Sequence, residues 1–91
     1  MKNKILAALA MGKPVVATRL SIEGLELRAD HDLLVADGSQ NFADKVVQLL
    51  RDPSYGKVLG QNGHSLVRQK YSWRATADVL DDALGSVIQP E

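Results

Sequence analysis

The tripeptide Asp30-His31-Asp32 brings together the side-chain types that proteins use for metal binding and for acid–base chemistry. The only other histidine, His64, is distant in the sequence and has polar neighbours, so we expect it on an exposed helix surface. The chain has no cysteine, which excludes thiolate nucleophiles, disulfides and Cys-ligated zinc. Three polar residues in a loop before a strand more often form a solvated turn than a reactive site. We therefore expect no metal site and no cofactor.

A second set of polar residues follows the first apolar β-branched run, residues 14–18. Thr18 and Arg19 stand at the carboxyl end of this predicted strand, and Glu23 lies in the loop after it. Ligands bind at this edge in open α/β sheets, so Thr18 and Glu23 are candidates for ligand contact. The alternative, an ordinary surface loop, is the commoner explanation for Glu23 and holds also for Thr18 and Arg19.

The elements that position these residues are predicted from the apolar pattern. Residues 2–11 are apolar on nearly every face, which predicts an enclosed helix, and Gly12 provides the usual stop. Residues 14–18 and 33–36 are continuous apolar runs typical of buried parallel strands. The polar stretch between them, residues 19–32, is predicted to be a loop.

The second half of the sequence predicts helices. Ser39 is expected to cap a helix over residues 40–51 that ends at Asp52-Pro53. A second helix is expected over residues 54–70, weakened by three glycines, and a third begins after Ser72. Each carries apolar residues at helical spacing, including Phe42, Val46, Leu49 and Leu50 in the first, and Trp73, Ala77, Leu80, Leu84 and Val87 in the last.

The composition excludes several classes of partner. Among 91 residues, eleven are basic and eleven acidic, so no net charge favours nucleic acid or an anionic membrane. Seven apolar residues, 5–11, fall far short of the ~20 needed to span a bilayer, and are short for a secretory signal. With 45% hydrophobic and 24% charged residues, the chain is expected to be one folded, cytoplasmic unit over residues 1–91.

The predicted order α-β-β-α-α-α describes a partial Rossmann-like α/β domain with two short parallel strands and four to five helices. Two strands that are covered on both faces need more sheet than two strands supply. Either further strands come from another chain, or these residues are the latter part of a larger α/β domain. Exposed strand edges favour pairing between copies, so we expect a homo-oligomer.

Seven short motifs follow one another along most of residues 3–84: Asn3–Thr18, Glu23-Gly24-Leu25, Leu33–Asp37, Phe42-Ala43, Leu49–Pro53, Leu59-Gly60 and Tyr71-Ser72-Trp73. In its order and approximate spacing, this succession resembles the donor domain of GT-B-type glycosyltransferases of group 1. The opening Asn3-Lys4 is also similar to sugar transferases of exopolysaccharide and exosortase-associated clusters.

The resemblance implies a two-domain enzyme that transfers a sugar from a nucleotide-diphosphate donor to a glycan or lipid-linked acceptor, with retention and without a protein-bound metal. It implies that the helix over residues 2–11 points its N-terminus at the donor diphosphate. Free backbone amides and the positive dipole end would favour that anion, with Lys2 and Lys4 adding charge around Asn3. The alternative is that both lysines are ordinary solvated residues.

One departure concerns Ala7, which occupies the position where the family has a Glu thought to hydrogen-bond the nucleotide ribose. Alanine has no acceptor oxygen for that role. The family's first Glu, its glycine-rich loop and its acceptor domain do not occur within these residues. We therefore expect donor binding at most, and no catalysis by this chain alone. The alternative is a non-catalytic α/β module that oligomerises through strand edges.

Overall fold

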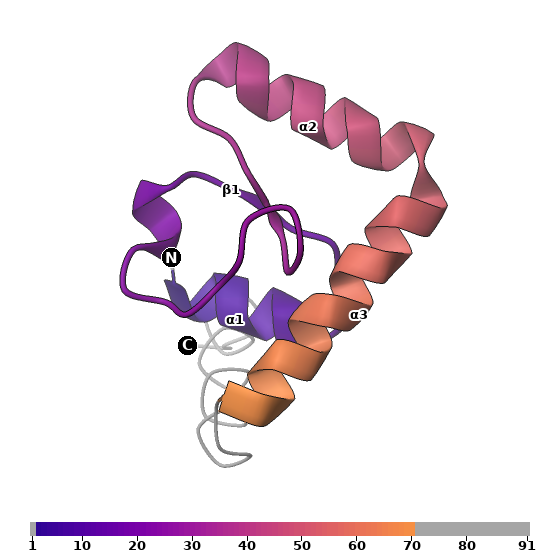
Figure 1. Ribbon diagram of the computed structural model, residues 1–91. Coiled ribbons are helices and arrows are strands. Elements are labelled where there is room, and N and C mark those ends of the chain that lie inside the picture. Colours follow the sequence, from indigo (N-terminus) through magenta and orange to yellow (C-terminus); the bar gives the residue numbers. More distant parts are fainter. Residues whose placement is uncertain (1, 71–91) are drawn as a thin grey trace, which may run out of the picture.

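The computed structural model describes residues 2–70 and has the predicted α/β class (Figure 1). The two strands pair in parallel, Val16 opposite Leu34 and Ala17 opposite Val35. Three α-helices and one 3-10 helix occur in this part of the chain, and the helix predicted after Ser72 lies outside it. The elements are α1 (Lys2–Ala10), β1 (Val16–Ala17), η1 (Leu20–Ile22), β2 (Leu34–Val35), α2 (Ser39–Arg51) and α3 (Pro53–Lys70).

Helix α1 ends as the sequence predicts. Gly12 has a φ of +74°, and its N–H donates to Leu9 O at 2.9 Å while the Lys13 N–H donates to Ala8 O at 3.0 Å. These two bonds satisfy carbonyl groups of the last turn. Glycine adopts the left-handed conformation required at this position with little loss of free energy. The reversal at Gly12 sends the chain directly into β1.

The core lies between α1, the strands and α3. Its buried members are apolar residues drawn from all three, with Leu9 and Leu33 completely inaccessible to solvent. In Figure 1 the strands lie between α2 and α1, and α3 passes beside α1. The buried cluster comprises Ile5, Leu6, Leu9, Ala17, Leu33 and Val67.

Helix α2 differs from its prediction in two respects. Gly38, not Ser39, precedes its first turn, and its carbonyl accepts the Phe42 N–H at 2.9 Å, so the expected Ser39 side-chain cap is wrong. Its apolar face is only half-buried, and Leu50 is 75% exposed. Helical spacing groups apolar residues on one face but does not determine how much protein covers that face.

Asp52 ends α2 and also begins α3. Its N–H donates to Gln48 O at 3.1 Å, while its side-chain Oδ1 accepts the Tyr55 N–H at 3.2 Å and the Ser54 hydroxyl at 2.9 Å. Pro53 suits the first helical position because its missing N–H would have had no intrahelical partner. One residue therefore caps both helices, which confirms the predicted stop and fixes the corner between them.

The three glycines of α3 form its contact face with the first half of the chain. Gly56, Gly60 and Gly63 recur at helical spacing, and all three are buried. A Cβ at position 60 would collide with the carbonyl group of Gly12, and one at 63 would lie 2.6 Å from Leu9 Cδ2 and 3.0 Å from Asp32 O. The sequence predicted only a cost in helix propensity. These glycines instead allow α3 to approach α1 closely.

Two alanine substitutions should therefore have opposite effects. At Gly56 a Cβ would make ordinary contacts of 3.7 Å with Leu49 and Pro14, so Gly56→Ala should raise the free energy of unfolding by up to about 1 kcal/mol through helix propensity. Gly60→Ala should lower it by roughly 1–3 kcal/mol, because the Gly12 backbone must move. Urea denaturation of both variants measures this difference. Equal effects would contradict the close packing at Gly60.

Candidate functional site

The amino end of α1 and the carboxyl end of β1 lie at the same edge of the fold. Because α1 precedes β1 and the chain reverses at Gly12, the helix starts near the place where the strand ends. Lys2 and Asn3 of α1 line an open hollow of about 570 Å³ together with Leu20 and Ser21 of η1. The first turn of α1 contains no acidic residue, so nothing in it opposes an anion.

The other predicted site residues have different surroundings. Lys4 is exposed but is not among the residues that line the hollow. Ala7 is only 4% exposed and also does not line it. Glu23 is exposed in the loop after η1. The structure thus brings Lys2 and Asn3 together with η1, and leaves Lys4, Ala7 and Glu23 outside this lining.

Thr18 shapes the site indirectly. Its Oγ1 lies 2.6 Å from the Ser21 hydroxyl and accepts the Ser21 N–H at 3.2 Å, which holds the turn of η1. Ser21 and Leu20 then face the hollow, and sequence reasoning did not identify either of them. The Thr18–Ser21 spacing of three residues is a signal for such a side-chain-supported turn.

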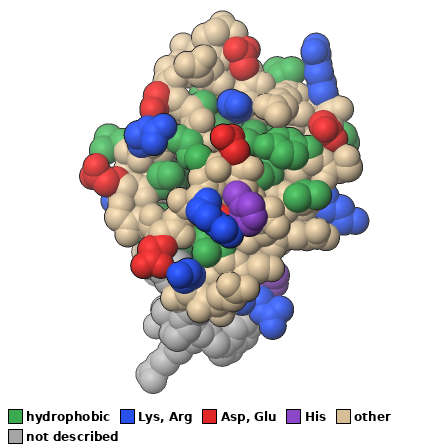
Figure 2. All heavy atoms as spheres, in the orientation of Figure 1, with side chains coloured by type: hydrophobic (Ala, Val, Ile, Leu, Met, Phe, Trp, Pro, Cys, Tyr) green, Lys and Arg blue, Asp and Glu red, His purple; other side chains and the backbone are tan. Residues whose placement is uncertain are grey.

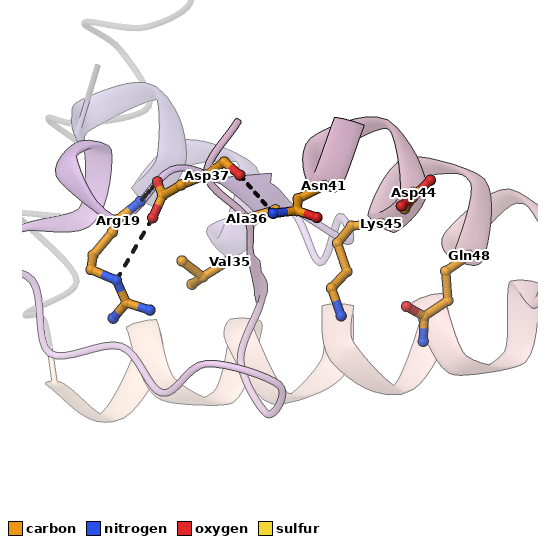
Figure 3. A pocket seen from close by; sticks show the side chains of 8 residues that line it. All are labelled: Arg19, Val35, Ala36, Asp37, Asn41, Asp44, Lys45 and Gln48. Atoms are coloured by element: carbon orange, nitrogen blue, oxygen red, sulfur yellow. Dashed lines mark hydrogen bonds and ion pairs between the residues drawn. The ribbon is translucent and has the colours of Figure 1, made fainter. Parts of the chain in front are cut away.

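A second hollow, of about 440 Å³, lies between the strand ends and α2 (Figure 3). Asp37 ties the two strand ends together, since its Oδ1 accepts the Arg19 N–H at 3.0 Å and its Oδ2 lies 3.8 Å from Arg19 Nε. Both side chains are largely exposed, so this ion pair contributes little to stability. The lining mixes both charges with amides and apolar groups: Arg19, Val35, Ala36, Asp37, Asn41, Asp44, Lys45 and Gln48.

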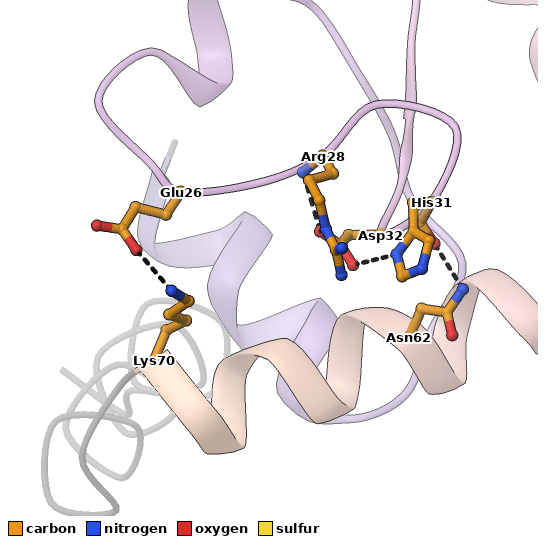
Figure 4. A network of polar contacts seen from close by, with 6 residues as sticks. All are labelled: Glu26, Arg28, His31, Asp32, Asn62 and Lys70. Carbon is orange, nitrogen blue, oxygen red and sulfur yellow. Dashed lines mark hydrogen bonds and ion pairs between the residues drawn. The ribbon is translucent and has the colours of Figure 1, made fainter.

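The tripeptide Asp30-His31-Asp32 is not the solvated turn that the sequence predicted. Asp32 is completely buried, and its carboxylate accepts the Arg28 N–H at 2.9 Å and a bond from His31 Nδ1 at 2.9 Å (Figure 4). Arg28 Nε lies 3.4 Å from the same carboxylate. Asn62 of α3 donates to His31 O at 2.9 Å. The group therefore closes the loop before β2 and attaches it to α3.

Burial by itself raises the pKa of Asp32, but the hydrogen bonds from His31 and Arg28 outweigh it and hold this pKa below its ordinary value. Asp32 thus stays ionised at neutral pH, with its acceptor oxygens occupied by protein donors. Within residues 2–70, no group of three or more His, Asp or Glu side chains is arranged to hold a metal ion. The hydrogen bonds of Asp32 and of His31 O give the tripeptide a structural role.

His64 is half-buried, which corrects its prediction as an exposed residue. Its Nδ1 donates to Ala10 O, the last carbonyl of α1, at 2.9 Å. The proton is assigned to Nδ1 because a carbonyl oxygen can only accept. This bond joins the middle of α3 to the end of α1.

Comparison with known families identifies the chain. The family described as "Glycosyl transferases group 1" matches residues 1–52, more than half of the sequence. The chain belongs to the group 1 glycosyltransferases. The match includes α1, both strands and α2, and with them the four described residues that line the hollow beside α1. No curated protein and no solved structure gives a significant match.

The surface of this glycosyltransferase chain carries no dominant charge on the face shown in Figure 2, where acidic and basic side chains are interspersed with apolar ones. This agrees with the balanced composition. Within residues 2–70, no helix has both the length and the apolar character that a membrane span requires.

Loss of the Asp32 charge should destabilise the protein and change its response to acid. Because the pKa of Asp32 is lower in the folded than in the unfolded protein, its stabilisation is present above about pH 3.9 and disappears as the pH falls through the folded-state pKa. Asp32→Asn should lower the free energy of unfolding at pH 7 by about 1–3 kcal/mol and flatten its decline below pH 4. Urea denaturation between pH 2.5 and 7 measures both effects.

Asp30→Asn is the matched control. Asp30 is exposed and has a φ of +63°, a conformation that asparagine also tolerates. The Asp30→Asn substitution should change the free energy of unfolding by less than about 0.5 kcal/mol. Similar losses in the two variants would contradict the special role of the buried carboxylate.

Proposed function

We propose that this chain forms part of the donor-binding domain of a GT-B-type sugar transferase, and that it binds the diphosphate of a nucleotide sugar at the amino end of α1. The observation that carries the proposal is the shared hollow of Lys2, Asn3, Leu20 and Ser21, within a segment that matches the group 1 family. The parent reaction would transfer the sugar to a glycan or lipid-linked acceptor, as in exopolysaccharide synthesis.

The chemistry of the hollow supports an anionic ligand. The first backbone N–H groups of a helix have no intrahelical acceptors, and the helix dipole is positive at this end. Lys2 and Lys4 are exposed in this turn and add positive charge. The Ser21 hydroxyl and the 75% exposed Leu20 supply a polar and an apolar contact for the rest of the ligand.

Ala7 limits the proposal to binding. Its methyl group is buried in α1 and offers no oxygen to a ribose hydroxyl. Among residues 2–70, those that line the hollow include no carboxylate and no histidine. We therefore assign these residues to holding the donor, in a cytoplasmic enzyme whose catalytic groups come from elsewhere, and we propose no catalysis by this chain alone.

Nucleotide titration tests the donor site. Millimolar UDP, GDP or ADP should shift the amide resonances of residues 2–7 and 18–24 in two-dimensional NMR spectra. Replacing Lys2 and Lys4 together by Gln should weaken binding by about two- to fivefold, the size of a helix-terminus charge effect.

Lys57→Gln provides a control for the loss of a lysine elsewhere, because Lys57 is an exposed lysine on α3. It removes one positive charge and should leave the affinity within experimental error. Absence of shifts at residues 2–7 with all three nucleotides, or equal weakening by both charge changes, would contradict the proposed site.

We propose as a second property that copies of the chain associate. Within residues 2–70, β1 pairs with β2 along one edge and with no other strand. On α2, which contacts β1, Leu50 is 75% and Val47 41% exposed. A free strand edge and exposed apolar side chains both favour association.

Light scattering of the purified chain tests self-association. The measured mass should exceed 9.9 kDa and fall toward it in Leu50→Lys, which adds a charge where the side chain is exposed and the fold tolerates it. Gln61→Lys, on an exposed position of α3, should not change the mass. A monomeric wild-type protein across micromolar to millimolar concentration would overturn this proposal.

A further inference from the structure

We propose that His64 is a positioning residue for the donor site: it fixes the carboxyl end of α1, so that the amino end, with Lys2 and Asn3, faces the nucleotide diphosphate. The inference rests on the proposed function and adds a residue that lies outside the segment matched by the family. His64 lies on α3, and its bond to Ala10 spans 54 positions of the sequence.

The bond completes the hydrogen bonding of the last turn of α1. The last four carbonyl groups of a helix have no continuing helical partners. Here the turn after α1 supplies donors to three of them: Met11 N–H for Ala7 O, Lys13 N–H for Ala8 O, and Gly12 N–H for Leu9 O. The fourth, Ala10 O, accepts from His64 Nδ1 at 2.9 Å. A side chain of α3 therefore donates a hydrogen bond to Ala10 O, the carbonyl group that these backbone bonds do not reach.

His64 directly follows the close contact at Gly63, and its hydrogen bond to Ala10 O adds a directional constraint to the packing of the two helices. Gly60 packs against the Gly12 carbonyl and Gly63 against Leu9, and these contacts set how closely the two helices approach. Van der Waals contacts of this kind allow sliding and rotation more easily than a hydrogen bond does, because a hydrogen bond weakens steeply with misalignment. His64 therefore restricts the axial position and rotation of α1 while the glycines restrict its distance.

A change at Ala10 reaches the ligand because α1 is short. Nine residues rise about 13.5 Å, so the helix moves as one rigid body. Its core residues Ile5, Leu6 and Leu9 pack in the buried cluster, and a tilt at the carboxyl end would re-aim the first-turn amides at the other end. Amide donors act on a phosphate only when aimed at it, so loss of the anchor should weaken nucleotide binding.

Isosteric replacement separates positioning from general packing. The side-chain amide nitrogen of asparagine stands the same number of bonds from Cα as His Nδ1, so His64→Asn can keep the bond to Ala10 O. The amide of His64→Gln lies one bond further out, and His64→Leu has no donor. Ser65→Asn, at the exposed neighbouring position, is the control for an asparagine in α3.

The experiment is NMR titration of each variant with UDP, at a temperature where circular dichroism shows the variant to be folded. His64→Leu and His64→Gln should bind about two- to tenfold more weakly than wild type, the range expected for one lost hydrogen bond. His64→Asn and Ser65→Asn should bind within about twofold. In the absence of UDP, the Leu and Gln variants should also shift the amide resonances of Asn3 and Lys4, and His64→Asn should not.

The outcomes distinguish the two proposals. Equal UDP affinity in wild type, His64→Gln and His64→Leu would overturn the positioning role and leave the donor site intact. Weakening in His64→Asn as large as in His64→Leu would also overturn it, because the donor would not matter. Absence of UDP, GDP and ADP binding by wild type would overturn the donor site itself. Should His64→Leu not fold, His64→Gln and His64→Asn carry the comparison.

Discussion

Gly60 of α3 lies against the backbone carbonyl of Gly12, so closely that no side chain fits between them. Gly12 is also the left-handed residue that ends α1 and sends the chain into β1. This one contact therefore joins the last described helix to the point where the first helix and the sheet meet. Gly63 also packs closely against Leu9 and Asp32 O, and the Asn62 side chain donates a hydrogen bond to His31 O. Helix α3 thus holds α1, the turn before β1 and the loop before β2 in one arrangement.

That arrangement brings the polar groups of α1 and η1 to one edge of the fold. With α1 reversed onto β1, the first turn of the helix and its lysines lie beside the residues that follow the strand. Thr18 supports the turn in which Ser21 and Leu20 face the same hollow. The proposed binding groups belong to the part of the chain that matches the group 1 glycosyltransferases, while the residues that pack against or bond to the end of α1, Gly60, Gly63 and His64, come from α3. In our proposal, binding and positioning are divided between two parts of the sequence.

Local signals were sufficient to predict the two strands and three α-helices of residues 2–70, but the 3-10 helix η1 lies in the stretch predicted to be a loop. Gly12 as a helix stop, Asp52-Pro53 as a boundary and the two apolar runs as parallel strands all agree with the structure. Contacts between distant segments could not be predicted in the same way. Asp32 was interpreted as solvated because a carboxylate in a polar loop is usually exposed, and only the fold brings Arg28 and His31 around it. For the same reason, Gly56, Gly60 and Gly63 were interpreted as a cost in helix propensity rather than as a contact face.

The most direct test of this account is the proximity of Gly60 to the turn at Gly12. Nuclear Overhauser measurements on the uniformly labelled protein should detect contacts from the Gly60 α protons to the α protons of Gly12 and the amide proton of Lys13. These contacts should persist in Gly56→Ala and disappear in Gly60→Ala. If α1 and α3 both form and wild-type protein gives no such contacts, α3 does not hold α1, and the account of how the donor edge is positioned is wrong.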